Sequence, residues 1–177
     1  MILGSKEIEY LVNSYQLGIE PFNTDFLSPA SYDLSLAGPF IKPEPTVNKI
    51  YTLDCLPLLE NNSRSIMKNC ILYPGDFVLV STQQKISLPL NIAACIDGRS
   101  TMGRIGINAH AVAGWVDPGF SGTFTLHISN NGPFSINLCE GDRVAQIVFM
   151  VVEGCLRGYQ GKYQNQNTTT GAVGDAT

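Results

Sequence analysis

The chain contains six short runs that have the length and composition of β-strands. Each run is bounded by Pro, Gly, Asn or Asp, which are residues that favour turns. The runs cover residues 30–36, 77–81, 92–96, 105–110, 123–129 and 144–152. Many short strands separated by turn signals are typical of an all-β barrel or jelly roll. This pattern constrains the fold more than any other feature of the sequence.

The run 123–129 alternates strictly between apolar and polar residues. Phe124, Leu126 and Ile128 share one face of the predicted strand, and His127 lies on the opposite face. The other residues of that polar face are Thr123, Thr125 and Ser129. This strand therefore has one core face and one polar face.

The two ends of the chain differ from this strand pattern. A short amphipathic helix is predicted in region 1–20, because apolar residues recur there at helical spacing. These residues are Ile8, Leu11, Val12 and Tyr15. The C-terminal region 160–177 is rich in Asn, Gln, Thr and Gly, so we expect it to be mobile without a ligand and to act as a lid. Region 41–71 shows little periodicity and is interpreted as an irregular connection or insertion.

Length and charge limit the classes of partner. A chain of 177 residues forms one domain, 1–177, and a charged fraction of only 15% favours a homo-oligomer. A net charge of −4 without a basic run argues against a nucleic acid polymer. No signal peptide or apolar span of about 20 residues appears, so no membrane partner is predicted.

Cysteine usage limits the chemistry and the compartment. The five cysteines are scattered and form no C-x-x-C pair, which favours reduced thiols and a cytoplasmic location. The signature of zinc-dependent nucleobase deaminases is absent, so a protein-bound zinc is not expected.

One segment has the composition of an anion site. Arg99, Ser100, Thr101 and Arg104 lie within six residues, next to two glycines. Arginines supply fixed charge, hydroxyls add donors, and glycines let backbone amides approach phosphate oxygens. Asp117 follows in the turn-like sequence V-D-P-G-F. A fixed carboxylate beside an anion site suggests hydrolysis or metal binding, whereas solvated arginines on hairpin loops are the alternative.

Several motifs together resemble the superfamily of dCTP deaminases and dUTP pyrophosphatases (dUTPases), and the dCTP deaminase-like branch most closely. The motifs are M-I-L-G-S-K-E-I, L-S-P-A-S-Y-D-L-S-L, P-G-D-F-V-L-V-S-T, D-G-R-S-T-M-G-R-I-G-I, V-D-P-G-F, G-D-R-V-A-Q-I-V-F and K-Y-Q-N-Q. The resemblance covers nearly the whole chain and is weakest in region 41–71.

The resemblance implies a distorted β-barrel or jelly roll of the dUTPase-like type with a short N-terminal helix. It also implies a homotrimer whose sites are shared between subunits, and a small deoxynucleoside triphosphate as substrate. Mg²⁺ would be bound mainly through the triphosphate. Positions that match substrate contacts of the family are Arg99, Ser100, Thr101, Ala111, Ala113, Trp115, Phe120, Gln146, Lys162, Tyr163 and Gln166. Asp117, Arg104 and His127 match or replace catalytic positions.

His127 is the main departure from the family. It stands where the deaminases carry a glutamate that moves protons between the attacking water and the cytosine ring. A carboxylate presents two equivalent oxygens, whereas an imidazole presents two opposed nitrogens and is partly cationic near its ordinary pKa of about 6.5. The sequence keeps Asp117, which the resemblance assigns to water activation at the α-phosphate.

These observations predict a dUTP diphosphatase, converting dUTP to dUMP and pyrophosphate on a dCTP deaminase-like scaffold. Two alternatives remain open at this point. The first is a dCTP deaminase that forms dUTP and ammonia, and the second is a catalytically inactive nucleotide-binding or sensing homologue.

Overall fold

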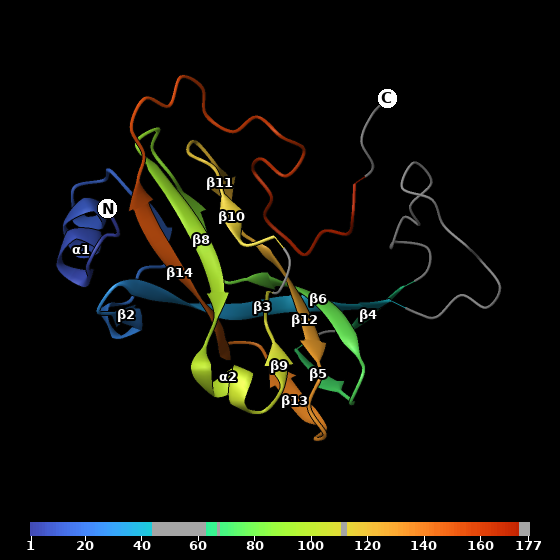
Figure 1. Ribbon diagram of the computed structural model, residues 1–177. Helices are drawn as coiled ribbons and strands as arrows, with labels where there is room; N and C mark the ends of the chain where they lie inside the picture. Colours follow the sequence, from blue (N-terminus) through green and yellow to red (C-terminus); the bar gives the residue numbers. More distant parts are fainter. Residues whose placement is uncertain (44–62, 67, 111–112, 174–177) are drawn as a thin grey trace.

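The computed structural model describes residues 1–43, 63–66, 68–110 and 113–173, and β-strands dominate it (Figure 1). The helical elements are α1 (Ser5–Asn13), the 3₁₀ turn η1 (Thr24–Phe26) and α2 (Ser100–Arg104). The strands are β1 (Gly18–Glu20), β2 (Leu27–Ser28), β3 (Ser31–Pro43), β4 (Ser63–Ile66), β5 (Asn69–Leu72), β6 (Phe77–Thr82), β7 (Lys85–Ser87), β8 (Ile92–Gly98), β9 (Ile107–Asn108), β10 (Trp115–Val116), β11 (Ser121–Gly122), β12 (Thr125–Asn130), β13 (Ile136–Cys139) and β14 (Arg143–Val151). No described helix is long and apolar enough to cross a membrane.

The largest sheet has nine antiparallel strands. Seven follow one another in the order β10-β8-β14-β3-β6-β12-β9, while β2 and β4 also pair with β3. The long strand β3 joins the two halves, because its first part pairs with β14 and its later part with β6. The sheet curls around the core (Figure 1). This arrangement confirms the prediction of an all-β fold with a short N-terminal helix.

The predicted alternation in β12 is present. Leu126 and Ile128 are fully buried in the core, and Phe124 just before the strand is 8% exposed. His127 and its polar neighbours on the other face are only partly buried. Burying alternate apolar residues fixes the register of the strand, because a slip of one residue would exchange the two faces. The polar side of β12 is thereby held facing away from the core.

The N-terminal helix is confirmed, but the prediction that Tyr15 belongs to its apolar face is wrong. Ile8 and Leu11 are buried, as expected. Tyr15 is 97% exposed, because α1 ends at Asn13 and Tyr15 adopts a positive φ of 59° beyond it. The apolar stripe therefore covers only two turns.

Two further sequence expectations need correction. The run 105–110 is mostly not a strand, since Ile105 caps α2 and only Ile107–Asn108 pair, as β9. Region 41–71 is not irregular throughout, because β3 continues to Pro43 and both β4 and most of β5 lie inside it. Residues 44–62 and 67 lie outside the described part of the chain.

The C-terminal segment folds back along β11 and β12 (Figure 1). The amide of Asn165 donates to the carbonyl of Ser121 at 2.7 Å, and the amide of Thr123 donates to the carbonyl of Gln166 at 2.8 Å. Farther along, the hydroxyl oxygen of Thr169 accepts a hydrogen bond from the amide of Ser81 at 2.9 Å. The segment is thus tied to the barrel, and its opening as a lid stays a prediction.

Candidate functional site

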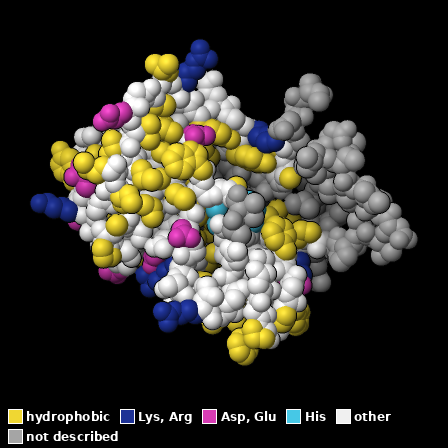
Figure 2. Space-filling view, viewed as in Figure 1, with side chains coloured by type: hydrophobic (Ala, Val, Ile, Leu, Met, Phe, Trp, Pro, Cys, Tyr) yellow, Lys and Arg dark blue, Asp and Glu magenta, His cyan; other side chains and the backbone are white. Residues whose placement is uncertain are grey.

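A cavity of about 460 Å³ lies between β12, β10 and the C-terminal segment. Its volume is within the range of small-molecule sites, about 300–1,000 Å³. Its lining includes seven residues that the sequence predicted as site residues, namely Ala113, Trp115, Asp117, Phe120, His127, Tyr163 and Gln166. Histidine side chains (cyan) are visible near the centre of the face shown in Figure 2. The cavity is therefore the candidate base and sugar site.

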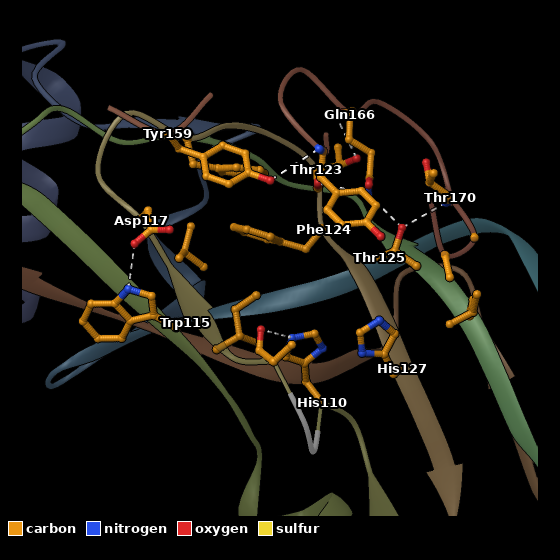
Figure 3. A pocket seen from close by; sticks show the side chains of 18 of the residues that line it. His110, Trp115, Asp117, Thr123, Phe124, Thr125, His127, Tyr159, Gln166 and Thr170 are labelled. Carbon is orange, nitrogen blue, oxygen red and sulfur yellow. Dashed lines mark hydrogen bonds between the residues drawn. The ribbon is translucent and has the colours of Figure 1, made fainter. Parts of the chain in front are cut away.

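The two histidines lie side by side in the cavity (Figure 3). The rings of His110 and His127 stack with their centroids 4.9 Å apart and an angle of 16° between their planes. Burial lowers the pKa of both imidazoles below the ordinary value, and the neighbouring His110 lowers the pKa of His127 further. Both rings are therefore neutral at pH 7, when an imidazole can accept a proton.

One nitrogen of His110 is fixed by the backbone. Nε2 lies 3.1 Å from the carbonyl oxygen of Ala113, and because a carbonyl only accepts, Nε2 must carry the hydrogen. Nδ1 of the neutral ring is then a bare acceptor. It is buried and has no hydrogen-bond partner among the described residues.

An aromatic wall closes another side of the cavity. Phe120 and Phe124 stack with centroids 5.0 Å apart, and Tyr159 of the C-terminal segment tilts against Phe120 at 5.8 Å. Phe120 is only 7% exposed, since the turn after β10 directs it inward. Such a wall offers a flat apolar surface to a ring ligand.

Trp115 and Asp117 lie at the mouth of the cavity. The indole Nε1–H of Trp115 donates to Oδ1 of Asp117 at 2.9 Å (Figure 3). Trp115 is 58% exposed, so its ring is not part of the core. The hydrogen bond orients one carboxylate oxygen and leaves the other available.

The C-terminal segment covers the cavity through a threonine of β12. The hydroxyl oxygen of Thr125 accepts hydrogen bonds from Nε2 of Gln166 at 2.7 Å and from the amide of Thr170 at 3.0 Å (Figure 3). Tyr163 also lines the cavity, whereas Lys162 does not. Of the three residues of the C-terminal segment that were predicted to contact the substrate, Tyr163 and Gln166 therefore line the cavity.

The predicted anion-binding residues lie elsewhere. Helix α2 is near the lower end of the sheet, away from β10, β11 and the C-terminal segment (Figure 1). Arg99, just before α2, pairs with the buried Asp33 at 3.2 Å, and Arg143 pairs with the same carboxylate at 3.3 Å. Ser100, Thr101 and Arg104 are exposed. We call Arg99, Ser100, Thr101 and Arg104 the cationic cluster. Within one chain, this cluster and the cavity are separate.

Gln146 lies next to the cationic cluster and does not line the cavity. Its side chain accepts from the hydroxyl of Ser31 at 2.8 Å and donates to the carbonyl of Gly98 at 3.2 Å. It thus supports the backbone directly before Arg99. The remaining predicted residue, Ala111, lies outside the described residues.

Sequence reasoning missed several cavity residues. His110 was assigned no role, although it is the only histidine besides His127 and lies close to Ala113 in the chain. Tyr159 and Thr170 were also missed, because nothing in their local sequence reports contact with β12. The polar face of β12 was the signal that could have identified Thr125.

Comparison with known proteins agrees with this geometry. The sequence profile described as dCTP deaminase-like matches residues 2–152. A protein of Methanosphaera stadtmanae is 37% identical over 84% of this chain and 78% of its own length. A protein of Coprothermobacter proteolyticus is 35% identical over 97% of this chain and 95% of its own length. Both are named "dCTP deaminase, dUMP-forming".

Solved structures support the fold. A dCTP deaminase of Agrobacterium tumefaciens matches with a TM-score of 0.64 and 23% identity over 85% of this chain, which spans about half (48%) of that protein. The native EIAV dUTPase matches with a TM-score of 0.52 and 18% identity, over 84% of this chain and 98% of its own.

The names of the relatives contradict the preference for a plain dUTP diphosphatase. They favour the alternative of dCTP deamination. The prediction of dUTP hydrolysis without deamination, which was drawn from His127, was therefore wrong. The chain belongs to the dCTP deaminase-like family.

Proposed function

We propose that this chain deaminates dCTP and then releases pyrophosphate, so that the final product is dUMP. Overall, dCTP and two waters would give dUMP, ammonia and pyrophosphate. The names of the relatives support this reaction. The single observation that carries it is the place of His127, which lines the cavity and stands at the position that the resemblance assigns to the family's proton carrier. Burial lowers the pKa of its imidazole.

A neutral imidazole can begin the deamination. Water must lose a proton as its oxygen attacks C4 of cytosine, and a base with a pKa near or below neutral pH can accept that proton without being blocked by a resident one. The apolar wall of Phe120 and Phe124 would hold the base, and it would keep bulk water away from His127.

The triphosphate would be bound by the cationic cluster of a neighbouring chain. Arg99, Ser100, Thr101 and Arg104 do not line the cavity of their own chain, yet this is the residue set that suits phosphates. A homotrimer that places α2 of one subunit against the cavity of the next would bring the two halves together. Arg99 would then exchange part of its pairing with Asp33 for phosphate oxygens.

Mg²⁺ would be carried by the substrate. Among the described residues, no group of three or more His, Cys, Asp or Glu side chains could hold a metal ion. The carboxylate of Asp33 is also engaged by two arginines. The proposal therefore assigns the ion to the phosphate oxygens of the substrate.

The test incubates the purified protein and Mg²⁺ with dCTP or dUTP in separate reactions, and measures ammonia, dUTP, dUMP and pyrophosphate. We expect ammonia and dUMP from dCTP, and loss of ammonia release in His127→Gln by about 100-fold or more. Ser129→Ala is the matched control, because Ser129 shares the polar face of β12 but does not line the cavity. Hydrolysis of dUTP without ammonia from dCTP, or binding without turnover, would contradict the proposal.

A further inference from the structure

His110 and His127 reach the same point of the cavity from different parts of the chain. His127 is fixed by β12, whose neighbours β6 and β9 pair on either side. His110 follows β9 and is held by the carbonyl of Ala113. Their rings are stacked 4.9 Å apart, so a charge on one ring is felt directly by the other.

The hydrogen bond to Ala113 decides which atom of His110 can react. Because Nε2–H donates to the carbonyl, any proton that His110 gains must go to Nδ1. Nδ1 is buried without a partner among the described residues, and it is therefore a basic atom that no other group uses. A buried polar atom without a partner is uncommon and suggests a functional constraint.

Deamination needs a protein group that carries protons from the water to the cytosine. This group needs two basic atoms and holds at most one proton at a time. Water adds to C4 of cytosine, one of its protons ends on N3, and the other ends on the amino nitrogen. The C4–N bond then breaks and ammonia leaves, while the water oxygen becomes the carbonyl of uracil. A carboxylate meets this need with its two oxygens, but a single imidazole offers its second nitrogen on the opposite edge.

Resting on the deamination proposed above, we propose that His127 replaces the single carboxylate as the proton carrier, and that His110, stacked on it, tunes its protonation. His127 is the catalytic residue that meets the substrate, and His110 is a positioning residue that acts through it. The pair has two basic atoms, and charge repulsion across the stack limits it to one proton. His110 thereby keeps His127 free to accept the proton of the attacking water.

Few other titratable groups face the pair. Among the described residues that line the cavity, they are Asp117 in the turn after β10, and Tyr159 and Tyr163 in the C-terminal segment. The carboxylate of Asp117 accepts a hydrogen bond from the indole of Trp115. The main influence of one imidazole on the other is therefore their direct contact.

The test uses His110→Gln, a variant that removes the titratable ring but keeps an amide able to donate to the carbonyl of Ala113. Imidazole NMR titration of the ligand-free protein follows the protonation of His127. We expect the protonation of His127 to shift to higher pH in His110→Gln, because a like-charged neighbour has been removed. Thermal unfolding of each variant checks that the fold is retained.

Kinetics on dCTP form the second arm. We expect His110→Gln to lower kcat at least about tenfold while KM stays within about threefold, and to move the acidic limb of the kcat profile to higher pH. The double variant with His127→Gln should be no slower than His127→Gln alone, because residues that act as a unit do not add.

The two arms separate this inference from the proposed function. A wild-type protein that releases no ammonia from dCTP would overturn the proposed function, and the NMR arm would still decide whether the histidines are coupled. Unchanged titration of His127 in His110→Gln would overturn the pair, whether or not kcat falls. Losses that add in the double variant would overturn it as well.

Discussion

At the scale of single residues, the site depends on histidines that the fold keeps neutral. His110 and His127 lose hydration on burial, and among the described residues no carboxylate partner favours the charged form of either ring. An exposed histidine at the same position in the sequence would be partly cationic at neutral pH. The environment, and not the residue type, therefore makes His127 a usable base.

The same burial makes the free energy of unfolding depend on pH. Both imidazoles have a pKa below the ordinary value of about 6.5 in the folded state, so the unfolded chain binds their protons first as the pH falls. At a pH above the pKa of the imidazoles in the unfolded chain, the histidines do not affect the free energy of unfolding. As the pH falls from there to their pKa in the folded state, the free energy of unfolding decreases. We expect urea midpoints to fall between pH 8 and pH 5.5, and to fall less in the variant carrying both His110→Gln and His127→Gln. Equal pH dependence in the two proteins would contradict this.

Sequence reasoning found most single residues of the site but not their placement. Asp117 was singled out from its turn motif, whereas Phe120 and His127 were identified through the resemblance to the family, and all three line the cavity. That His110 stacks on His127 depends on β9 pairing with β12, a contact between segments about 20 residues apart. No periodicity in either segment records it.

At the scale of elements, the shortest pieces were the least predictable. Strands β9, β10 and β11 have two residues each and cannot show an alternating pattern. Helix α2 has five residues and no apolar face, and it was not predicted as a helix. Longer elements such as β12 and β14 were found, because their burial pattern repeats over six residues or more.

The turn that holds α2 against β9 requires a glycine. Gly106 has a φ of +82°, and a Cβ there would lie 2.4 Å from the backbone of Gly132. We expect Gly106→Ala to lower the free energy of unfolding by about 3 kcal/mol or more, from the positive φ and the clash together. Gly141→Ala is the matched control, with a φ of +90° and no atom within 4 Å, and should cost only about 1 kcal/mol. Equal losses in urea unfolding would show that the contact with Gly132 can yield.

Thr125 accepts two of the hydrogen bonds that attach the C-terminal segment to the cavity wall. Thr125→Val keeps the side-chain shape but removes the acceptor of two hydrogen bonds, from Gln166 and Thr170. Losing two bonds of about 1 kcal/mol each should make the segment open roughly 30 times more often. We expect faster trypsin cleavage after Lys162 in this variant, with the core intact, and no change in Ser129→Ala. A cleavage rate like that of the wild type would mean that other contacts hold the segment.

At the scale of the whole molecule, we propose that a single chain carries two incomplete halves of one site. The cavity supplies the histidines, Asp117 and the aromatic wall, but no arginine lines it among the described residues. The cluster around Asp33 supplies arginines. A low charged fraction of 15% is consistent with surface that becomes buried between subunits. The two observations together favour a cyclic oligomer over a monomer.

Mixing two inactive chains tests this assembly. Arg104→Ala removes a cation from α2 and leaves the cavity intact, whereas Asp117→Ala damages the cavity and leaves α2 intact. If each site of a trimer combines the cavity of one subunit with α2 of the next, every mixed trimer contains one intact site. Equal mixing with subunit exchange should then restore about a quarter of wild-type turnover of dCTP to dUMP. Each variant alone, carried through the same exchange procedure, is the control. If light scattering shows mixed oligomers but activity does not recover, Arg104 and Asp117 belong to the site of the same chain. A monomer at micromolar concentration would rule out shared sites altogether.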